Sequence, residues 1–472
     1  MSQPVSTGII DRTLANLRSA WHGFMSSGHE IRPLNLNPEL PESDKTILRR
    51  WMHECLQAKG GEVSSRARSA VLGQAYLSLN ELGRIKYLEI LARDFDVSRE
   101  TLNDVKKKID EQETSPELVS NLREMLTPPR VKLLTQFNDL PEGVKFLVDL
   151  RSDVRSFMKS APVLKSLDFD LRRLLKSWFD IGFLELKRLT WDEPASLLEK
   201  IIEYEAVHEI SSWHDLKNRL DKDRRCYAFF HPSMPDEPLI FVEIALVKGL
   251  AKNIQTLLDE NAPAIDPDDA DTAIFYSITN TQKGLHGIHF GSFLIKRVVD
   301  HLSRDLPKLN TFATLSPVPG FTKFIRNLDD DLEKRLITDR EQSDLVRIFG
   351  SERLKEAIAA SGWQLKLNGA DEVKNILEKI CAYYLTRVKK DGRALDPVAE
   401  FHLNNGARLE YINWMADNSE NGIRQSAGIM VNYLYRLSDI EKNHERYRET
   451  GSVATSASVN NLLKSMDLSD NQ

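Results

Sequence analysis

The feature of this sequence that most constrains its fold is a segment in which two apolar runs flank a glycine-containing loop and a helix. The first run covers residues 272–278, the helix is predicted over 292–303, and the second run covers 309–315. A strand that is followed by a helix and then by another strand is typical of a sheet with helices packed on it. The segment therefore predicts a domain of the α/β or α+β class.

The loop between the first strand and the helix contains Gly284, Gly287 and Gly291, with Gln282 and Lys283 ahead of them. Glycines allow a backbone to come close to a ligand, and the unpaired amides at the start of a helix bind anions. A pyrophosphate is the anion that suits such a loop best. The spacing fits neither the Rossmann fingerprint nor a Walker loop, which requires Gly-Lys-Ser/Thr. By itself the loop is equally consistent with glycines that only serve a tight turn.

Further strands are predicted on both sides of this segment. Two of them flank a proline-rich turn, and two more lie near the C-terminus. They cover residues 226–230, 239–242, 407–414 and 429–435. The end of the chain, from Thr450 on, is rich in Ser, Asn and Asp, so we expect it to fray, although residues 459–463 could dock as a short helix.

The first third of the chain is predicted to be helical. Residues 65–108 contain few helix breakers, and Pro41 and the Pro128–Pro129 pair mark breaks between helices. Apolar side chains recur at helical spacing at Leu164, Leu167, Leu171, Leu174, Leu175 and Trp178. We predict an all-helical domain over residues 1–178 that serves packing and oligomerisation, followed by a catalytic domain over residues 179–472.

Length and composition exclude several classes of protein. A chain of 472 residues is long for one hydrophobic core, which agrees with two domains. Its 64 basic and 70 acidic residues are spread along the chain, so nothing indicates a nucleic-acid-binding surface. The apolar stretch 239–247 contains Glu243 and is too short to span a membrane. Cys55, Cys226 and Cys381 lie far apart and form neither a metal-binding spacing nor a disulfide framework, so a reducing compartment, the cytoplasm, is expected.

Several longer motifs carry a resemblance to a known family. They are His231-Pro232-Ser233-Met234-Pro235, Thr281-Gln282-Lys283-Gly284-Leu285-His286-Gly287, Leu315-Ser316-Pro317-Val318-Pro319-Gly320-Phe321, the run from Asp396 to Ala407, Ile412-Asn413-Trp414-Met415-Ala416-Asp417 and Asn432-Tyr433-Leu434-Tyr435. Together these colinear motifs resemble the malonyl-CoA decarboxylase family. The glycine loop is also similar to the pyrophosphate loop of acetyltransferase-type domains, which bind CoA.

The resemblance implies an all-helical N-terminal domain and a mixed α/β catalytic domain with the acetyltransferase-like (GNAT-type) fold. It implies that the chain converts malonyl-CoA and a proton to acetyl-CoA and carbon dioxide. No metal and no organic cofactor is expected, and neither a nucleic acid nor a membrane is expected as a partner. Members of the family are commonly tetramers that assemble through the helical domain, so we expect a homotetramer.

Ser316 is the first candidate catalytic residue. It lies at the end of a predicted strand, where Pro317 and Pro319 restrict the backbone and Gly320 permits a turn. From spacing alone it reads as a serine in a proline turn. The resemblance implies that Ser316 is the catalytic serine, which handles a proton and orients the malonyl carboxylate. It is not a nucleophile elbow, because no Gly-x-Ser-x-Gly surrounds it.

His402 is the second candidate. Asp396 and Pro397 can begin a helix and Gly406 can end it, which puts His402 near the helix C-terminus. That position favours a protonated imidazole and therefore predicts a proton donor at neutral pH. A half-buried histidine with satisfied hydrogen bonds is the commoner case. The resemblance implies that His402 is the catalytic histidine.

The resemblance also implies a set of substrate-binding residues. They are Gln282, Gly284, His286, Gly287, Ile288, His289, Phe290, Gly291 and Ser292. His289 replaces an acidic residue of many relatives, and it either contacts a phosphate of the ligand or packs. Asn432 and Tyr435 are weaker candidates, because each lies in a β-like run where sheet packing is the alternative.

Two other classes of protein fit part of this pattern. An acyl-CoA-dependent acyltransferase would use the same CoA loop but would need an acceptor pocket and a base for an amine. A non-catalytic acyl-CoA sensor would bind CoA and would need neither Ser316 nor His402.

Overall fold

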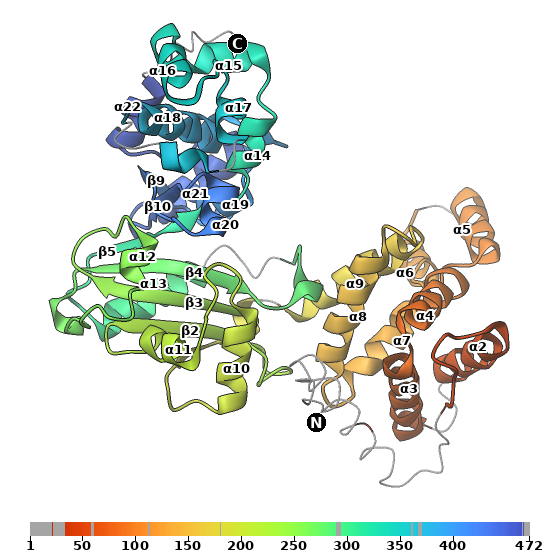
Figure 1. The fold of residues 1–472 in the computed structure, drawn as a ribbon. Helices are drawn as coiled ribbons and strands as arrows, with labels where there is room; N and C mark the ends of the chain where they lie inside the picture. Colours follow the sequence, from red (N-terminus) through yellow and green to blue (C-terminus); the bar gives the residue numbers. More distant parts are fainter. Residues whose placement is uncertain are drawn as a thin grey trace, which may run out of the picture. The chain divides into compact units, whose positions relative to one another are not determined.

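The computed structural model describes residue 21 and residues 34–57, 61–111, 114–179, 181–288, 294–359, 362–366, 371–464 and 466. The chain divides into two compact units (Figure 1). The first comprises Met1–Glu185, Phe229–Ile240 and Asn280–Phe290, and the second comprises Leu186–Ala228, Phe241–Thr279 and Gly291–Gln472. The first unit is therefore not continuous in sequence, since two later segments belong to it.

The first unit is built from helices. In chain order these are α2 (Glu42–Leu56), α3 (Gly61–Ser78), α4 (Glu81–Asp94), α5 (Arg99–Glu111), α6 (Pro116–Met125), α7 (Pro129–Asn138), α8 (Gly143–Phe157) and α9 (Leu164–Trp178), with short 3-10 helices η1 (Ile181–Phe183) and η3 (Lys283–Leu285). The predicted breaks are confirmed, because Pro41 and Pro128 are the N-cap residues of α2 and α7. The apolar spacing correctly predicted α9.

Aromatic side chains fill the core of the first unit. The ring of Trp21 lies 5.0 Å from that of Phe146 and 6.3 Å from that of Phe137. Trp21 Nε1 donates a hydrogen bond of 2.7 Å to the carbonyl oxygen of Pro141. A Cβ added at Gly73 on α3 would overlap the Trp21 ring, so this glycine makes room for the indole.

The second unit contains a mixed sheet and its helices. Up to the sheet's sixth strand, the elements are β1 (Glu185–Leu189), α10 (Ala195–Tyr204), α11 (Trp213–Arg219), β2 (Arg224–Phe230), β3 (Ile240–Val247), α12 (Ile254–Leu257), η2 (Pro267–Asp269), β4 (Thr272–Asn280), α13 (Leu294–Asp305), β5 (Thr311–Thr314) and β6 (Ser316–Pro317). The remaining elements are α14 (Phe321–Arg326), α15 (Asp330–Leu336), α16 (Asp339–Phe349), α17 (Leu354–Ala359), η4 (Trp363–Lys366), α18 (Asp371–Arg387), β7 (Lys389–Lys390), β8 (Arg393–Ala394), α19 (Pro397–Asn404), β9 (Arg408–Asn413), α20 (Glu420–Ser426), β10 (Met430–Leu434), α21 (Ile440–Thr450) and α22 (Ala457–Lys464).

The main sheet has the strand order β1-β2-β3-β4-β5-β10-β6, and β9 pairs with β10. Strands β4 and β5 are parallel and are joined through α13, whereas β10 is antiparallel to β5, β6 and β9. The predicted fold class, a helical N-terminal region followed by a mixed α/β domain, is confirmed. The predicted strands are also present, although the strand expected over 239–242 extends to Val247.

Strands β5 and β6 follow the same edge of β10 and are separated by Leu315. The register of β5 with β4 ends at the pair Phe275–Thr314, and the N–H of Leu315 still donates to the carbonyl oxygen of Phe275 at 3.0 Å. One residue later, Ser316 pairs with Val431 of β10. Ser316 therefore lies at the point where the chain leaves β4 and continues along β10.

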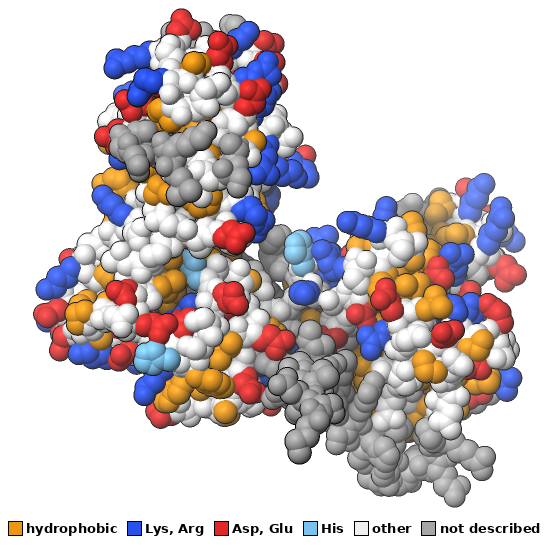
Figure 2. Space-filling view, in the orientation of Figure 1, with side chains coloured by type: hydrophobic (Ala, Val, Ile, Leu, Met, Phe, Trp, Pro, Cys, Tyr) orange, Lys and Arg blue, Asp and Glu red, His pale blue; other side chains and the backbone are white. Residues whose placement is uncertain are grey.

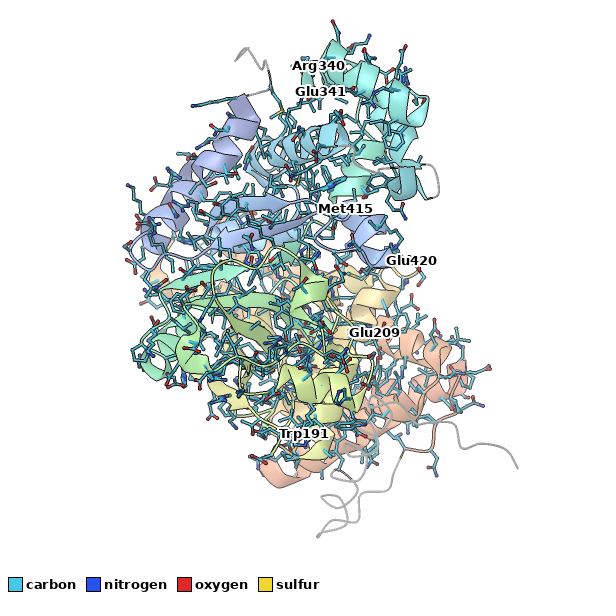
Figure 3. The ribbon with its side chains drawn as sticks, turned by 60° about the vertical axis from the view of Figure 1, so that its left-hand side comes forward. Trp191, Glu209, Arg340, Glu341, Met415 and Glu420 are labelled. Atoms are coloured by element: carbon cyan, nitrogen blue, oxygen red, sulfur yellow. The ribbon has the colours of Figure 1, made fainter. Side chains whose placement is uncertain are left out.

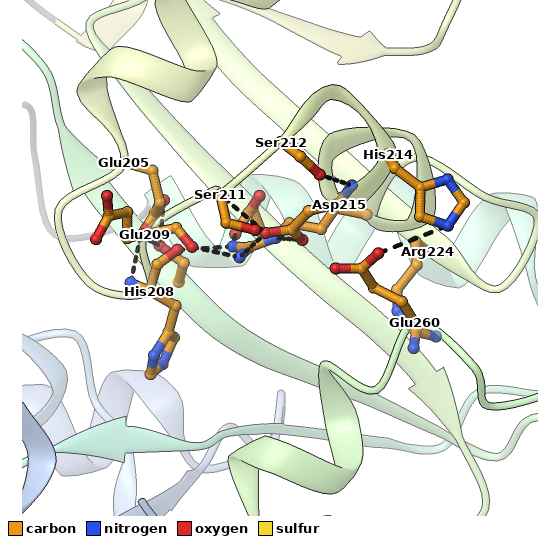
Figure 4. A network of polar contacts seen from close by, with 12 residues as sticks. Glu205, His208, Glu209, Ser211, Ser212, His214, Asp215, Arg224 and Glu260 are labelled. Atoms are coloured by element: carbon orange, nitrogen blue, oxygen red, sulfur yellow. Dashed lines mark hydrogen bonds and ion pairs between the residues drawn. The ribbon is translucent and has the colours of Figure 1, made fainter. Parts of the chain in front are cut away.

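A buried polar network fixes the segment between α10 and α11 to the sheet (Figure 4). Both carboxylate oxygens of Glu205 accept the hydroxyl of Ser277 on β4 at 2.8 Å. Arg219 donates to Asp215 at 2.8 Å and to Glu243 on β3 at 3.1 Å. Burial, with the nearby charge of Glu205, raises the pKa of Glu243 to about 8. The buried ion pairs of Arg219 with Asp215 and Glu243 therefore connect α11 to β3.

Polar contacts also fix the outer helices of the second unit (Figure 3). Glu341, in the first turn of α16, accepts the N–H of Thr338 at 2.8 Å, while Thr338 accepts the N–H of Glu341 in return. This capping box satisfies two donors that the helix start leaves unpaired. Glu341 also accepts from Nζ of Lys379 at 2.6 Å, which joins α16 to α18.

The expectation that the chain frays from Thr450 is wrong for the described residues. The N–H of Leu409 on β9 donates to the carbonyl oxygen of Ala454 at 2.9 Å, and α22 follows. Val459 on α22 is fully buried, which confirms the alternative of a docked helix. Polar composition misled the prediction, because a few apolar side chains and a backbone pairing suffice to order the segment.

Charges of both signs are mixed over the face that Figure 2 shows. Within the described ranges, no helix combines the length and apolar character that crossing a membrane requires. The same ranges contain no group of three or more His, Cys, Asp or Glu side chains arranged to hold a metal ion. Cys55, Cys226 and Cys381 are buried and form no disulfide.

Candidate active site

Strand geometry decides which way Ser316 faces. Successive side chains of a strand point to opposite faces, so Thr314 and Ser316 share one face and Leu315 takes the other. Leu315 is fully buried in the apolar cluster that includes Ile274 and Met430. The hydroxyl of Ser316 donates to Thr314 Oγ1 at 2.9 Å. The burial of Leu315 therefore anchors the strand and directs Ser316 away from the apolar cluster.

The turn after Ser316 is held at two backbone amides. The N–H of Val318 donates to Ser426 Oγ at 3.0 Å, and the N–H of Gly320 donates to Asp396 Oδ2 at 3.1 Å. A Cβ added at Gly320 would overlap the hydroxyl of Tyr384, so the glycine leaves room for this side chain. The two proline residues of the motif thus belong to a turn that is fastened to α20 and to the start of α19.

Helix α19 carries His402, as predicted. Asp396 is its N-cap residue, and Asp396 Oδ1 accepts the N–H groups of Val398 and Ala399 at 3.0 and 3.1 Å. Gly406 follows the helix with φ of 79°, a left-handed conformation that favours glycine. The helix spans Pro397–Asn404, so His402 lies in its last turn.

The structure brings Ser316 and His402 together, although 86 residues separate them. Ser316 Oγ lies 3.1 Å from His402 Nε2, and the hydroxyl oxygen of Tyr435 lies 2.8 Å from His402 Nδ1. Because Ser316 donates its proton to Thr314, His402 must be the donor in its bond to Ser316. The imidazole then carries its proton on Nε2 and accepts the Tyr435 hydroxyl at Nδ1. These side chains form one hydrogen-bonded chain, and all of them are buried.

The expectation that His402 is protonated at neutral pH is wrong for this state of the protein. Burial lowers the pKa of His402 to about 3. A helix C-terminus stabilises a charged histidine by at most about 2 kcal/mol, and removing the imidazolium from water costs more than that here. Burial also raises the pKa of Tyr435 well above its usual range, so this hydroxyl keeps its proton.

Tyr433 contacts the imidazole of His402, whereas Asn432 forms hydrogen bonds elsewhere in the sheet. The ring of Tyr433 stacks on His402 with centroids 4.6 Å apart and planes 23° apart, which restrains the imidazole. Asn432 does not reach this chain of side chains. Its amide donates to the carbonyl oxygen of Thr314 at 2.7 Å and its oxygen accepts from Asn413 at 2.8 Å. Asn432 therefore fills the break between β5 and β6, which agrees with the packing alternative.

The described part of the glycine loop lies in the first unit. A Cβ added at Gly284 would overlap the carbonyl oxygen of Val148 on α8, so Gly284 permits close packing. Gln282 is buried, with its amide 3.4 Å from the carbonyl oxygen of Pro238, and Ile288 is buried as well.

Two other predicted substrate-binding residues of the loop are not buried. His286 is exposed, and Gly287 has φ of 77° with open space on the side where a Cβ would lie. His286 is therefore accessible, and nothing blocks the approach to Gly287 on that side. His289, Phe290, Gly291 and Ser292 lie outside the described residues.

Sequence reasoning missed Thr314, Tyr433 and the second role of Asp396. Thr314 had a usable signal, because it lies two residues before Ser316 in a predicted strand. Asp396 was recognised as a helix cap, but nothing local indicates that its other oxygen binds Gly320. Tyr433 stood in one of the family motifs, but nothing in the sequence distinguished it from the apolar residues beside it.

Comparisons with known proteins agree with the motifs. The family model of the malonyl-CoA decarboxylase C-terminal domain matches residues 182–472, and that of the N-terminal domain matches residues 95–179. The mitochondrial malonyl-CoA decarboxylase of Anser anser anser is 38% identical over 83% of this chain and 82% of its own length. The protein of the same name from Rattus norvegicus is also 38% identical, over 72% of each chain.

Solved structures give the same result. The crystal structure of malonyl-CoA decarboxylase from Rhodopseudomonas palustris is 42% identical and has a TM-score of 0.82, covering 88% of this chain and 99% of that one. The corresponding structure from Agrobacterium vitis is 39% identical, with a TM-score of 0.79 and the same coverage. The chain therefore belongs to the malonyl-CoA decarboxylase family of enzymes.

Proposed function

We propose that this enzyme decarboxylates malonyl-CoA to acetyl-CoA and carbon dioxide, without a metal or an organic cofactor. The observation that carries the proposal is the buried contact of 3.1 Å between Ser316 Oγ and His402 Nε2. Membership of the family supports malonyl-CoA as the substrate, since the relatives carry that name.

The reaction sets three tasks for the protein. The bond between the α-carbon and the carboxylate carbon breaks, and its electron pair is delocalised from the α-carbon into the thioester oxygen as an enolate. One proton must then reach the α-carbon, so that malonyl-CoA plus a proton gives acetyl-CoA plus carbon dioxide. The enzyme has to hold the carboxylate, stabilise the enolate oxygen and deliver the proton. Placed donors give the largest benefit at the oxyanion, and a positioned acid contributes about 10²–10⁴-fold.

Ser316 suits the contact with the substrate. Its hydroxyl donates to Thr314 in the present structure, and rotation about the Cβ–Oγ bond would redirect the proton towards a bound malonyl group while Oγ stays in place. His402 Nε2–H would continue to donate to Ser316 Oγ and would hold the hydroxyl in that orientation. Ser316 then orients the carboxylate and passes the proton to the α-carbon.

His402 suits the supply of the proton once the substrate is bound. The imidazole is neutral in the present structure because it is buried. A malonyl carboxylate brings a negative charge close to it, and an opposite charge within a few ångström favours the imidazolium. His402 would therefore take up a proton together with the substrate, while Tyr435 retains its own.

Incubating the purified protein with malonyl-CoA and no acceptor tests the proposal. We expect acetyl-CoA and carbon dioxide in equal amounts, followed by chromatography and by carbon dioxide release. Turnover that appears only when an amine is added would favour an acyltransferase. Bound malonyl-CoA that is recovered intact would identify a sensor and would exclude the proposed decarboxylation.

We further propose that the chain assembles as a homotetramer through its helical unit. In that unit, Phe169 on α9 is 66% exposed, which is unusual for a side chain of this size. Light scattering of the purified protein measures the mass directly. A monomer at micromolar concentration would contradict this assembly.

A further inference from the structure

Helix α8 of the helical unit is in direct contact with the glycine loop. Arg151 on α8 is almost fully buried, and its Nη1 donates to the carbonyl oxygens of Gly284 and His286 at 2.6 and 3.1 Å. Arg151 Nε donates to Asp168 on α9 at 2.9 Å. One guanidinium therefore fixes two peptide units of the loop and is itself held by a carboxylate.

These contacts decide where the loop amides point. In a trans peptide the carbonyl oxygen and the next N–H lie on opposite sides. Because the carbonyl of His286 is turned towards Arg151, the N–H of Gly287 is turned away from it. Gly287 has positive φ, and the space beside its Cα is open. Arg151 thus gives the loop the conformation in which the Gly287 amide is presented for binding.

A second arginine of α8 places a positive charge beside the His286 side chain of the loop. Arg155 lies one turn after Arg151, and its Nη2 lies 3.2 Å from His286 Nδ1. A guanidinium has no acceptor, so Arg155 is the donor and His286 carries its ring proton on Nε2. Lys283 in the same loop is exposed. A guanidinium therefore lies next to the imidazole that precedes Gly287, and an exposed ammonium belongs to the same loop.

We propose that Arg155 and His286 bind a phosphate group of the CoA thioester, and that Arg151 is the residue that positions the loop for this contact. The inference rests on the proposed function, because it assigns a binding role within the same reaction. Guanidinium groups favour phosphate through paired, charge-assisted hydrogen bonds, and an adjacent backbone N–H adds a further donor. The helical unit, predicted only to pack and assemble, thereby supplies a phosphate contact of its own.

Substrates that carry different phosphates test the assignment. Malonyl-CoA has a pyrophosphate and a 3′-phosphate, malonyl-dephospho-CoA lacks only the 3′-phosphate, and malonyl-pantetheine lacks both phosphate groups together with the adenosine. We expect Arg155→Ala to raise KM for malonyl-CoA about 10- to 100-fold, the effect of one charge-assisted hydrogen bond, with kcat little changed. KM for malonyl-pantetheine should stay at the wild-type value. Arg155→Lys should recover part of the loss, and Arg93→Ala, at an exposed arginine on α4 of the same unit, is the control.

The dephospho substrate distinguishes the two phosphates. An Arg155→Ala effect that persists with malonyl-dephospho-CoA assigns the contact to the pyrophosphate, and an effect that disappears assigns it to the 3′-phosphate. An equal rise in KM for malonyl-CoA and malonyl-pantetheine, or no rise for either, would overturn the inference. If the wild-type enzyme turns over none of the three substrates, the proposed function fails instead, so the two failures are distinguishable.

Arg151 has a separate test, since it acts through the loop. Arg151→Lys keeps the charge but carries all its donors on one nitrogen, whereas the guanidinium reaches Asp168 from Nε and the two carbonyl groups from Nη1. We expect it to raise KM for malonyl-CoA by a similar factor while kcat for malonyl-pantetheine is retained. Loss of kcat with both substrates would indicate damage to the fold and would contradict a positioning role.

Discussion

Asp396 accepts a hydrogen bond of 3.1 Å from the backbone N–H of Gly320, and it also caps the helix that carries His402. One buried carboxylate therefore joins the turn that follows Ser316 to the start of α19. The two catalytic candidates come from distant parts of the sequence, and this link restrains the distance between them.

Asp396→Asn separates these two tasks. The amide oxygen can still cap α19, but an NH₂ group replaces the oxygen that accepts from Gly320. We expect a loss of about 1–3 kcal/mol in unfolding free energy, since a buried N–H loses its partner, and a fall in kcat with KM for malonyl-CoA little changed. Denaturant unfolding and steady-state kinetics measure both. Asp396→Ala should be less stable by about a further 1 kcal/mol because the cap is lost. Wild-type kcat in folded Asp396→Asn would disprove the link.

Gly320→Ala should disrupt the same turn by a steric route. The added Cβ would overlap the hydroxyl of Tyr384, so we expect a lower melting temperature and a lower kcat. Removing that hydroxyl with Tyr384→Phe in the double variant should restore much of both. The single variant Tyr384→Phe is the control. Equal damage in the single Gly320→Ala and double variants would show that the overlap is not the cause.

Ser316→Ala and His402→Ala should each lower turnover at least ~10²-fold, as loss of a positioned proton-transfer group does. Because the two side chains are hydrogen-bonded to each other, the double variant should lose little more than either single variant. Stopped assays of acetyl-CoA formation measure these rates. Near-normal turnover in either folded single variant would exclude that residue from its role.

The neutral state of His402 predicts how stability depends on pH. An unfolded histidine has its usual pKa near 6.5, whereas burial lowers the pKa of His402 in the fold to about 3. Between these values the unfolded chain binds one proton more, so stability falls as the pH falls. At pH 5 the loss from this group is about 2 kcal/mol. The unfolding free energy should be measured at pH 7.5 and at pH 5 for the wild type and for His402→Gln. The decrease between the two pH values should be smaller in the variant by that amount. An unchanged difference would contradict a buried neutral histidine.

Proton uptake on binding follows from the proposed role of His402. A sulfonate analogue of malonyl-CoA keeps the negative charge but cannot lose carbon dioxide. Calorimetry at pH 7.5 in buffers of different ionisation enthalpy should show uptake of up to about one proton per site, since a nearby anion favours imidazolium. His402→Gln should show correspondingly less uptake. Equal uptake by the variant and the wild type would assign the proton to another group.

Local sequence was sufficient to predict where several helices begin or end. Proline positions marked the starts of α2 and α7, apolar spacing predicted α9, and Asp396, Pro397 and Gly406 bounded α19. These features are local, because caps, turns and periodic apolar faces depend on residues only a few positions apart. The motifs around Ser316 and His402 identified the same two residues that the structure places in contact.

Tertiary structure alone decided the protonation of His402, the link between Asp396 and Gly320, and the contact of Arg151 with the glycine loop. Each depends on atoms that are far apart in the chain, and 133 residues separate Arg151 from Gly284. Burial reversed the charge that the helix C-terminus predicted, because desolvation outweighs a terminal dipole once water is excluded. Local sequence carries no record of how much water a side chain loses, and only the packed fold determines it.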